Sequence, residues 1–380
     1  MKKYLLSPGP TPVPEECLAK MAEPIIHHRT PAYVEMNKLA MEKMKKVFYT
    51  DGDVLIFVSS GTGAMEGAVV NTIDKNDKAI VVRSGKFGER WGELVETYGG
   101  VPLYIDLEWG KKLEPKLIAD LLDKNPDTKA VFTTLTETST GIVYPIKEIG
   151  EIVSGTDALL IVDAISGLGG QEFYMDDWKV DITVSGSQKG LMLPPGQAYA
   201  AVNEKAWKII KQKSRACYYF NWAKYLKGQV GAGKDPFTGA VSHTKALLKA
   251  LEIIEKDTME SRFQRYKVLA KACRAAVNAI GLELFAEVPC DVVTAVKVPE
   301  GIDGKLLVKK LRDEYGVTIA GGQAHVAGKI FRIAHMGYIE RFDIIIIISA
   351  LEMVLAELGY EFRMGNGVAA AQKILAEEYI

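Results

Sequence analysis

Cysteine is scarce in this chain of 380 residues, which contains four: Cys17, Cys217, Cys273 and Cys290. They lie far apart and form no Cys-x-x-Cys pair. This spacing favours neither a disulfide framework nor a zinc or iron–sulfur site. We therefore expect buried thiols in a reducing cytoplasm and no metal site.

An excess of one charge and a long apolar run are also missing. The 47 basic and 48 acidic residues give a net charge of -1, so no global field would attract nucleic acid or an anionic membrane. The longest apolar run, residues 344–354, is about half of what a membrane-spanning helix needs and contains Glu352. The apolar stretch at the N-terminus is too short for a signal-peptide core. These absences predict a cytoplasmic protein whose partner is a small molecule.

The first half of the sequence has the pattern of an open α/β fold. Short apolar runs alternate with longer amphipathic segments, which is typical of repeated strand–helix units and a parallel sheet covered by helices on both faces. The predicted strands span residues 54–58, 79–83, 130–133, 159–162 and 182–184. The predicted helices between them span residues 65–73, 89–97 and 115–123.

The pattern changes after residue 242, and the length exceeds what one hydrophobic core usually supports. Apolar residues at helical spacing predict long helices, and strand-like segments follow them. The predicted helices span residues 243–256, 259–280 and 304–315, and the predicted strands 292–298 and 330–334. The isoleucine-rich run 344–348 has strong β-propensity, yet helical spacing continues past it to a glycine stop, so we predict a helix. We expect an N-terminal arm (1–14), a large domain (15–256) and a small α+β domain (257–380).

A glycine-rich segment, residues 59–66 (SSGTGAME), follows an apolar strand and opens a helix. Small residues let the backbone approach an anion, and the free N–H groups of a first helical turn suit a phosphate. The segment is not a dinucleotide fingerprint, because Glu66 stands where the third glycine is needed. Two interpretations stay open, a phosphate-binding loop or a tight turn without a ligand.

An acid and a lysine each follow a predicted strand. Asp163 comes directly after the apolar run 159–162, where a buried carboxylate needs either a cationic partner or a helix-capping role. Lys189 stands in the segment SGSQKG before a stiff Pro-Pro-Gly turn, so its backbone has little freedom. With the phosphate-ready helix, these residues suggest an amine that forms a Schiff base with an electron-sink cofactor.

These motifs, together with residues 7–14 (SPGPTPVP) and 332–337 (RIAHMG), closely resemble the class V pyridoxal-phosphate-dependent aminotransferases. Within that family the sequence is most similar to the alanine/serine–glyoxylate (serine–pyruvate) aminotransferases. The resemblance extends over nearly the whole chain. It implies the fold type I architecture of pyridoxal-phosphate enzymes, with a mostly parallel sheet in a large α/β domain and a smaller α+β C-terminal domain.

The resemblance also implies roles for individual residues. Lys189 would hold pyridoxal 5'-phosphate as a Schiff base and move the substrate proton, while Asp163 would pair with the pyridine N–H. Phe87 would stack on the cofactor ring, where many relatives have tryptophan. Arg332 would bind the substrate carboxylate with its planar fork, although without the resemblance a structural ion pair is the favoured interpretation of this arginine. The remaining cofactor contacts implied by the resemblance are Ser60, Gly61, Thr62, Thr138 and Gln188.

One segment departs from the family pattern. Family members donate a tyrosine and a threonine from the neighbouring subunit to the cofactor phosphate, so the resemblance implies a homodimer. Thr238 matches the threonine, but Asp235 stands at the tyrosine position, where an acid would repel a phosphate. The contribution of this segment is therefore left open.

The resemblance implies a ping-pong transaminase that moves an amino group from alanine or serine to glyoxylate or pyruvate. A phosphoserine aminotransferase is the alternative enzyme, and a catalytically silent member that serves as a binding subunit is the alternative without activity. The silent member is disfavoured because Lys189, Asp163 and Arg332 are all present. A cysteine desulfurase is disfavoured because acids flank Cys290 and would raise the pKa of its thiol.

Overall fold

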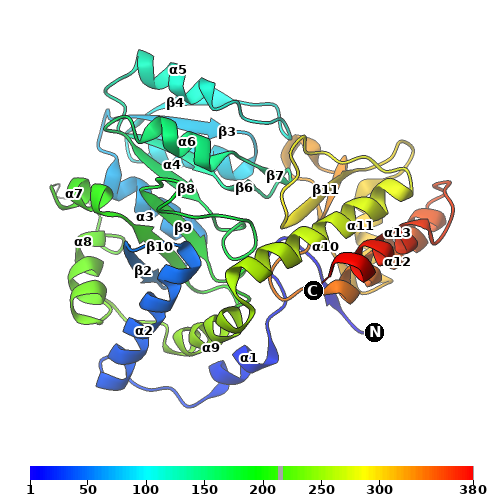
Figure 1. The fold of residues 1–380 in the computed structure, drawn as a ribbon, viewed down its shortest axis with the longest axis horizontal. Helices are drawn as coiled ribbons and strands as arrows, with labels where there is room; N and C mark the ends of the chain where they lie inside the picture. The colour runs from blue at the N-terminus through cyan, green and yellow to red at the C-terminus, as the bar shows by residue number, and fades with distance from the viewer. Residues whose placement is uncertain (213–216, 380) are drawn as a thin grey trace.

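The computed structural model describes residues 1–212 and 217–379, and its largest element is a seven-stranded sheet (Figure 1). In spatial order the strands are β2 (Asp53–Phe57), β10 (Ala198–Val202), β9 (Ile182–Gly186), β8 (Leu159–Asp163), β5 (Ala130–Thr134), β3 (Lys78–Arg83) and β4 (Val101–Asp106). Strands β9, β8, β5, β3 and β4 pair in parallel, whereas β10 is antiparallel to both of its neighbours. The predicted α/β class with a mostly parallel sheet is confirmed.

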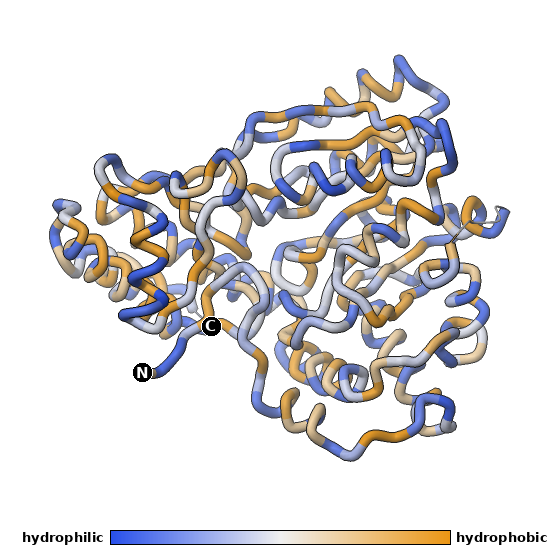
Figure 2. Tube along the Cα trace, turned by 180° about the vertical axis from the view of Figure 1, so that it is seen from behind, coloured by the Kyte–Doolittle hydropathy of each residue, from blue (hydrophilic) through white to orange (hydrophobic). Residues whose placement is uncertain are grey.

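Helices cover both faces of this sheet because its strands are apolar on both sides. In β2, Val54 and Ile56 belong to one buried cluster, while Leu55 and Phe57 belong to another on the opposite face. The first face packs against α2 (Pro31–Phe48), α5 (Lys116–Lys124), α6 (Ile146–Val153) and α9 (Val241–Asp257). The second packs against α3 (Gly61–Thr72), α4 (Lys86–Thr97), α7 (Glu204–Gln212) and α8 (Trp222–Tyr225). Figure 2 shows hydrophobic stretches running through the interior and hydrophilic ones along outer turns.

All five strands predicted in the first half are present, but the sequence pattern missed β4 and β10. Strand β4 lies at the sheet edge, is partly exposed and contains Pro102, which is tolerated there because an edge strand need not donate every hydrogen bond. Strand β10 is rich in alanine, so its sequence has little β-propensity although every residue is buried. It forms a strand because it is buried between β2 and β9 and pairs with both.

The C-terminal part has its own apolar core around an antiparallel sheet. The sheet consists of β11 (Val293–Lys297), β14 (Ile330–Ala334) and β13 (Ala320–Gly321). Helices α10 (Met259–Ala279), α11 (Gly304–Asp313), α12 (Arg341–Glu357) and α13 (Asn366–Glu378) lie around it (Figure 1). The predicted helix over 344–348 is confirmed, since Ile344, Ile347, Ile348 and Leu351 of α12 are buried at helical spacing. The domain boundaries at residues 14 and 256 stay predictions.

The N-terminal segment joins this C-terminal core to the large sheet. Strand β1 (Tyr4–Leu5) pairs in parallel with β12 (Val317–Thr318). A few residues later, the Thr11 N–H donates to the Gln188 carbonyl at 3.1 Å, and its hydroxyl donates to the Lys189 carbonyl at 3.1 Å. The segment therefore begins on the C-terminal core and reaches the loop that carries Lys189 at Thr11.

Short elements complete the described chain: α1 (Glu15–Ala22), β6 (Thr136–Glu137), β7 (Ile142–Val143), the π-helix η1 (Leu226–Val230) and the 3-10 helix η2 (Ala324–Val326). No helix among the described residues has the length and apolar character needed to cross a membrane.

Candidate active site

A cavity of about 240 Å³ opens where strand β8 ends and the loop after β9 begins. This is the edge at which open α/β sheets bind their ligands. Segments distant in sequence form its walls: residues 9–10, the first turns of α3 and α4, the end of β8 and the loop after β9. Seven of the predicted site residues line it: Ser60, Gly61, Thr62, Phe87, Asp163, Gln188 and Lys189.

Asp163 is the last residue of β8 and is 5% exposed. One carboxylate oxygen accepts the Ile165 N–H at 2.7 Å. Burial raises the pKa of Asp163 to about 7, although that N–H and the positive charges of Arg90 and Lys189 act in the opposite direction. This carboxyl group is therefore poised to ionise fully once a cationic partner lies next to it.

Lys189 is 7% exposed, and its ammonium group donates to the Pro8 carbonyl. Its own carbonyl accepts from the Thr11 hydroxyl and, at 3.0 Å, from the Met192 N–H, so the backbone is held as predicted. Burial lowers the pKa of Lys189 to about 8; Asp163 opposes this shift and Arg332 adds to it. A lysine with this pKa is a competent nucleophile near neutral pH.

The first turn of α3 and Gln188 form one end of the cavity. The Ser60 side chain makes no capping bond to the helix, and the side-chain oxygen of Gln188 is buried without a hydrogen-bond partner in the described chain. A half-turn of this amide would present its N–H groups at the same place. A Cβ on Gly61 would lie 2.5 Å from Ile165, so the turn has no room for a larger residue. Free N–H groups of a first turn, small residues and an unpaired amide together suit an anion such as phosphate.

Glu137 fixes the start of α4, where Phe87 lies, and the sequence analysis missed it. Its carboxylate is fully buried and accepts the N–H groups of Phe87 at 3.1 Å and Gly88 at 3.0 Å. The Ser139 hydroxyl and N–H also donate to it, at 2.5 and 3.2 Å. Burial raises the pKa of Glu137 against these four hydrogen bonds. The signal in the sequence was an acid inside a run of threonines and serines, which is equally typical of a polar turn.

Arg332 lies on β14 and is 5% exposed, but the structural ion pair considered above is not what holds it. Its Nε and one terminal nitrogen donate to the Gly321 carbonyl at 3.1 and 2.8 Å, and the other terminal nitrogen donates to the Thr138 carbonyl at 2.9 Å. A guanidinium has five N–H donors, so one remains on each terminal nitrogen. Burial lowers the pKa of Arg332 to about 10 against the opposing charge of Glu137.

Thr138 is buried but does not line the cavity directly. Its hydroxyl is hydrogen-bonded to the hydroxyl of Ser166, which does line the cavity. Together with its carbonyl contact to Arg332, this bond places Thr138 between the cavity and the predicted substrate-binding arginine.

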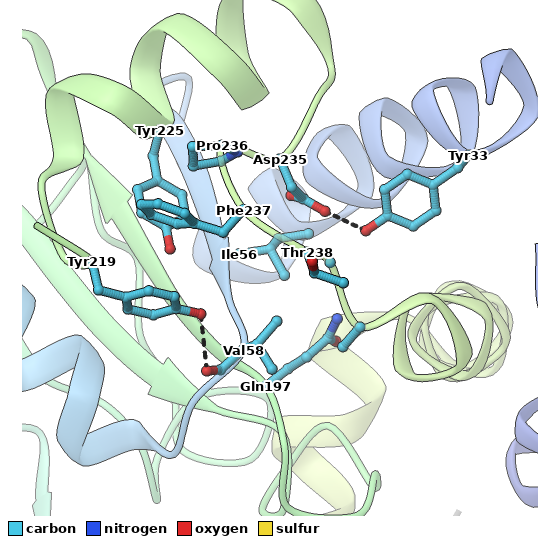
Figure 3. A pocket seen from close by; sticks show the side chains of 12 residues that line it. Tyr33, Ile56, Val58, Gln197, Tyr219, Tyr225, Asp235, Pro236, Phe237 and Thr238 are labelled. Carbon is cyan, nitrogen blue, oxygen red and sulfur yellow. Dashed lines mark hydrogen bonds between the residues drawn. The ribbon is translucent and has the colours of Figure 1, made fainter. Parts of the chain in front are cut away.

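The segment around Thr238 lies apart from the cavity within one chain. Thr238 lines a second, small cleft with Val58, Gln197 and Tyr219 (Figure 3). The structure therefore does not bring Thr238 to Lys189 in one chain.

The Asp235 carboxylate is held inside its own chain. It accepts the Tyr33 hydroxyl at 2.5 Å, the Gln229 amide at 2.6 Å and the Asn37 amide at 3.3 Å. Figure 3 shows it turned toward Tyr33 on α2. An acid is thus accommodated at this position because these donors satisfy it.

The sheet edge, the cavity and the buried lysine and acid together have the features expected of an enzyme's active site. The family model of the class V aminotransferases matches residues 3–350, and the chain belongs to this family. The protein is therefore a class V aminotransferase.

Two relatives and one solved structure show how far the similarity extends. The chain is 36% identical to an L-aspartate–glyoxylate aminotransferase of Paracoccus denitrificans, over 96% of this chain and 94% of the relative. It is 35% identical to a serine–glyoxylate aminotransferase of Methylorubrum extorquens, over 99% and 96%. The crystal structure of a ureidoglycine–glyoxylate aminotransferase from Bacillus subtilis superposes with a TM-score of 0.95 at 29% identity, over 99% of both chains.

The contact between Gly9 and Lys189 generates a first prediction. Gly9 has a φ of +106°, and a Cβ there would lie 2.6 Å from the Lys189 ammonium nitrogen. We expect Gly9→Ala to lower the free energy of unfolding by about 2–4 kcal/mol, because backbone strain and overpacking add. Urea unfolding measures this. Gly301→Ala is the matched control, since Gly301 has a φ of +83° but no atom within 4 Å, and it should cost about 1–2 kcal/mol. Equal losses in the two variants would contradict the contact.

Proposed function

We propose that the protein is a pyridoxal-phosphate-dependent transaminase that transfers the amino group of alanine or serine to glyoxylate or pyruvate. The observation that carries the proposal is the pair of buried groups on one cavity, Lys189 with a pKa of about 8 and Asp163 with a pKa of about 7. The relatives support glyoxylate as the acceptor, because their names share it while the donors differ.

The residues of the cavity fit pyridoxal phosphate. The first turn of α3, with Ser60, Gly61 and Thr62, would supply donors for the phosphate, and so would the Gln188 amide after a half-turn, since its side-chain oxygen is buried and unpaired. Asp163 would accept the pyridine N–H, and Phe87 would face the ring from the start of α4. The bound cofactor supplies an electron sink for the carbanion that forms when the substrate loses its α-proton.

Lys189, Asp163 and Arg332 have separate roles in the proposed transamination. Lys189 in its neutral form would hold the cofactor, and once the substrate amine has taken its place it would accept the substrate α-proton on its side-chain nitrogen. Asp163 stays ionised beside the cationic pyridine N–H, because an opposite charge lowers the pKa of a buried acid. The two remaining N–H groups of Arg332 bind the substrate carboxylate, and the Thr138 carbonyl and Gly321 carbonyl hold the guanidinium in place.

We further propose a homodimer in which Thr238 of one copy reaches the cofactor phosphate of the other. The cleft of Thr238 borders apolar surface that is open in one chain: Tyr218 is 76% exposed and packs on Phe237, and Val58 is 44% exposed. A second copy of the chain would cover it. A cytoplasmic location and the division into an arm, a large and a small domain belong to the same proposal.

Replacement of Lys189 tests the cofactor directly. We expect the wild type to develop a visible absorption band with pyridoxal phosphate that survives dialysis. Lys189→Ala and Lys189→Arg should develop no such band and lose at least about 1,000-fold in transamination rate, since neither variant offers an attacking amine of lowered pKa. Absorption spectra and a coupled oxo-acid assay measure the two effects. A wild type that stays colourless would overturn the proposal.

The pKa of Lys189 predicts how cofactor attachment depends on pH. Because burial lowers this pKa from 10.5 to about 8, the neutral amine becomes more abundant as pH rises, and is dominant about one unit above 8. The rate constant for attachment to the cofactor-free protein should therefore rise from pH 6 and reach half its maximum near pH 8, as stopped-flow absorbance would show. Arg332→Gln removes a repelling charge, so its half-maximum should lie at higher pH. A rate that does not vary between pH 6 and 9 would contradict this.

A half-reaction screen identifies the substrate. Alanine, serine, aspartate, glutamate and phosphoserine would each be mixed with the loaded enzyme, and loss of the absorption band followed. We expect alanine or serine to react fastest and glyoxylate or pyruvate to restore the band. Arg332→Lys should raise KM for all of these substrates by about 10- to 100-fold, because one ammonium cannot replace a bidentate fork. Reaction with phosphoserine alone would favour the alternative enzyme, a phosphoserine aminotransferase.

A further inference from the structure

Arg90, which is not among the predicted site residues, also lines this cavity. It lies on α4 one turn after Phe87, so the two side chains share a helix face. Its guanidinium carbon is 5.1 Å from the centre of the Phe87 ring, and one terminal nitrogen donates to the Thr62 hydroxyl at 3.2 Å. Arg90 therefore bridges the start of α4 and the start of α3 across one wall of the cavity.

The charge of Arg90 has no acidic partner within ion-pair distance in the described part of the chain. Other cations nearby do: Lys86 of the same helix pairs with Glu89 at 2.7 Å, and Arg83 pairs with Asp106 at 2.6 Å. A guanidinium has five N–H donors. Among the described residues, the Arg90 guanidinium has one acceptor, the Thr62 hydroxyl. A half-buried cation with unused donors, turned into a cavity, is suited to an anionic ligand.

The neighbours of Arg90 indicate which anion this is. Thr62 belongs to the first turn of α3, where the other donors, the helix N–H groups and the Gln188 amide, are neutral. A phosphate monoester carries a charge of about -1.5 to -2 near pH 7, and a partly buried charge of that size needs a cation. Of the side chains that line the cavity, Lys189 and Arg90 are cationic, and Lys189 is required for attachment of the aldehyde.

We propose that Arg90 is a cofactor-binding residue that neutralises and holds the phosphate group of pyridoxal phosphate, next to Thr62 and the first turn of α3. The inference rests on the proposed function. In this proposal the positive charge for the phosphate comes from α4 of the same chain, because Thr238 of a second copy is neutral.

Two other roles for Arg90 predict different measurements. Its charge also acts on Asp163, so it could serve the ring end of the cofactor instead. It could also hold the phosphate of a phosphorylated substrate. Pyridoxal, which lacks the phosphate but keeps the ring and the aldehyde, separates the first possibility from our proposal, and binding measured without any substrate excludes the second.

The experiment compares the affinities of wild type, Arg90→Met and Arg90→Lys for pyridoxal phosphate and for pyridoxal, by absorbance titration of the cofactor-free protein. We expect Arg90→Met to bind pyridoxal phosphate about 10- to 100-fold more weakly, the loss of a charge-assisted hydrogen bond, and to bind pyridoxal as the wild type does. Arg90→Lys should lose less, because it keeps the charge without the fork. Inorganic phosphate should raise the Tm of the wild type more than that of Arg90→Met.

Lys86→Met is the matched control, since it removes a cation from the same helix that does not line the cavity; its affinities should be unchanged. Equal losses for pyridoxal phosphate and pyridoxal in Arg90→Met would overturn the inference and assign Arg90 to the ring end. Unchanged affinity for pyridoxal phosphate would also overturn it. A wild type that binds neither compound would instead overturn the cofactor proposal itself, so the two failures are distinguishable.

Discussion

The removal of Lys189 and Asp163 from water is the constraint on which the rest of the site depends. Desolvation alone pushes the amine and the carboxyl group toward their neutral forms. Both are thereby brought to pKa values near neutrality, where a small change in charge nearby decides their state. A ligand that brings a cationic group to Asp163 and an aldehyde to Lys189 would settle both at once, which is the chemistry that the pyridine N–H and the aldehyde of pyridoxal phosphate would provide.

Maintaining that desolvated state requires walls from distant parts of the chain. The N-terminal segment passes over Lys189 at Pro8 and Gly9, about 180 residues away in sequence, and is itself anchored by β1 in the C-terminal core. Glu137 of β6 holds the start of α4, which forms another wall of the cavity. The position of the Lys189 side chain thus depends on contacts that link the two apolar cores. A packing change in either core would therefore alter the site.

The sequence predicted those parts of the site that local rules determine. Asp163 could be recognised because an acid at the end of an apolar strand must face a cavity or a partner, and the first turn of α3 because small residues follow a strand and open a helix. Glu137, Arg90 and Gly9 could not be found in this way. Their importance lies in contacts with residues tens to almost two hundred positions away. The residues next to Glu137 in the sequence, for example, do not distinguish a buried acceptor from a surface acid. Strand β10 was missed for the same reason, since burial by its neighbours overrides its alanine-rich composition.

Asp235 shows how a departure from a family pattern can be harmless. An acid repels a phosphate less when its carboxylate is turned away and hydrogen-bonded elsewhere, and here three donors from α2 and η1 hold the carboxylate. Gln229, one of these donors, also exchanges two hydrogen bonds with the backbone of Ile56, at 3.0 and 2.7 Å. That amide therefore closes the free edge of β2 and anchors the turn that presents Thr238. The acid serves the shape of the turn, so the positive charge that a phosphate needs must come from elsewhere in the site, and Arg90 is placed to supply it.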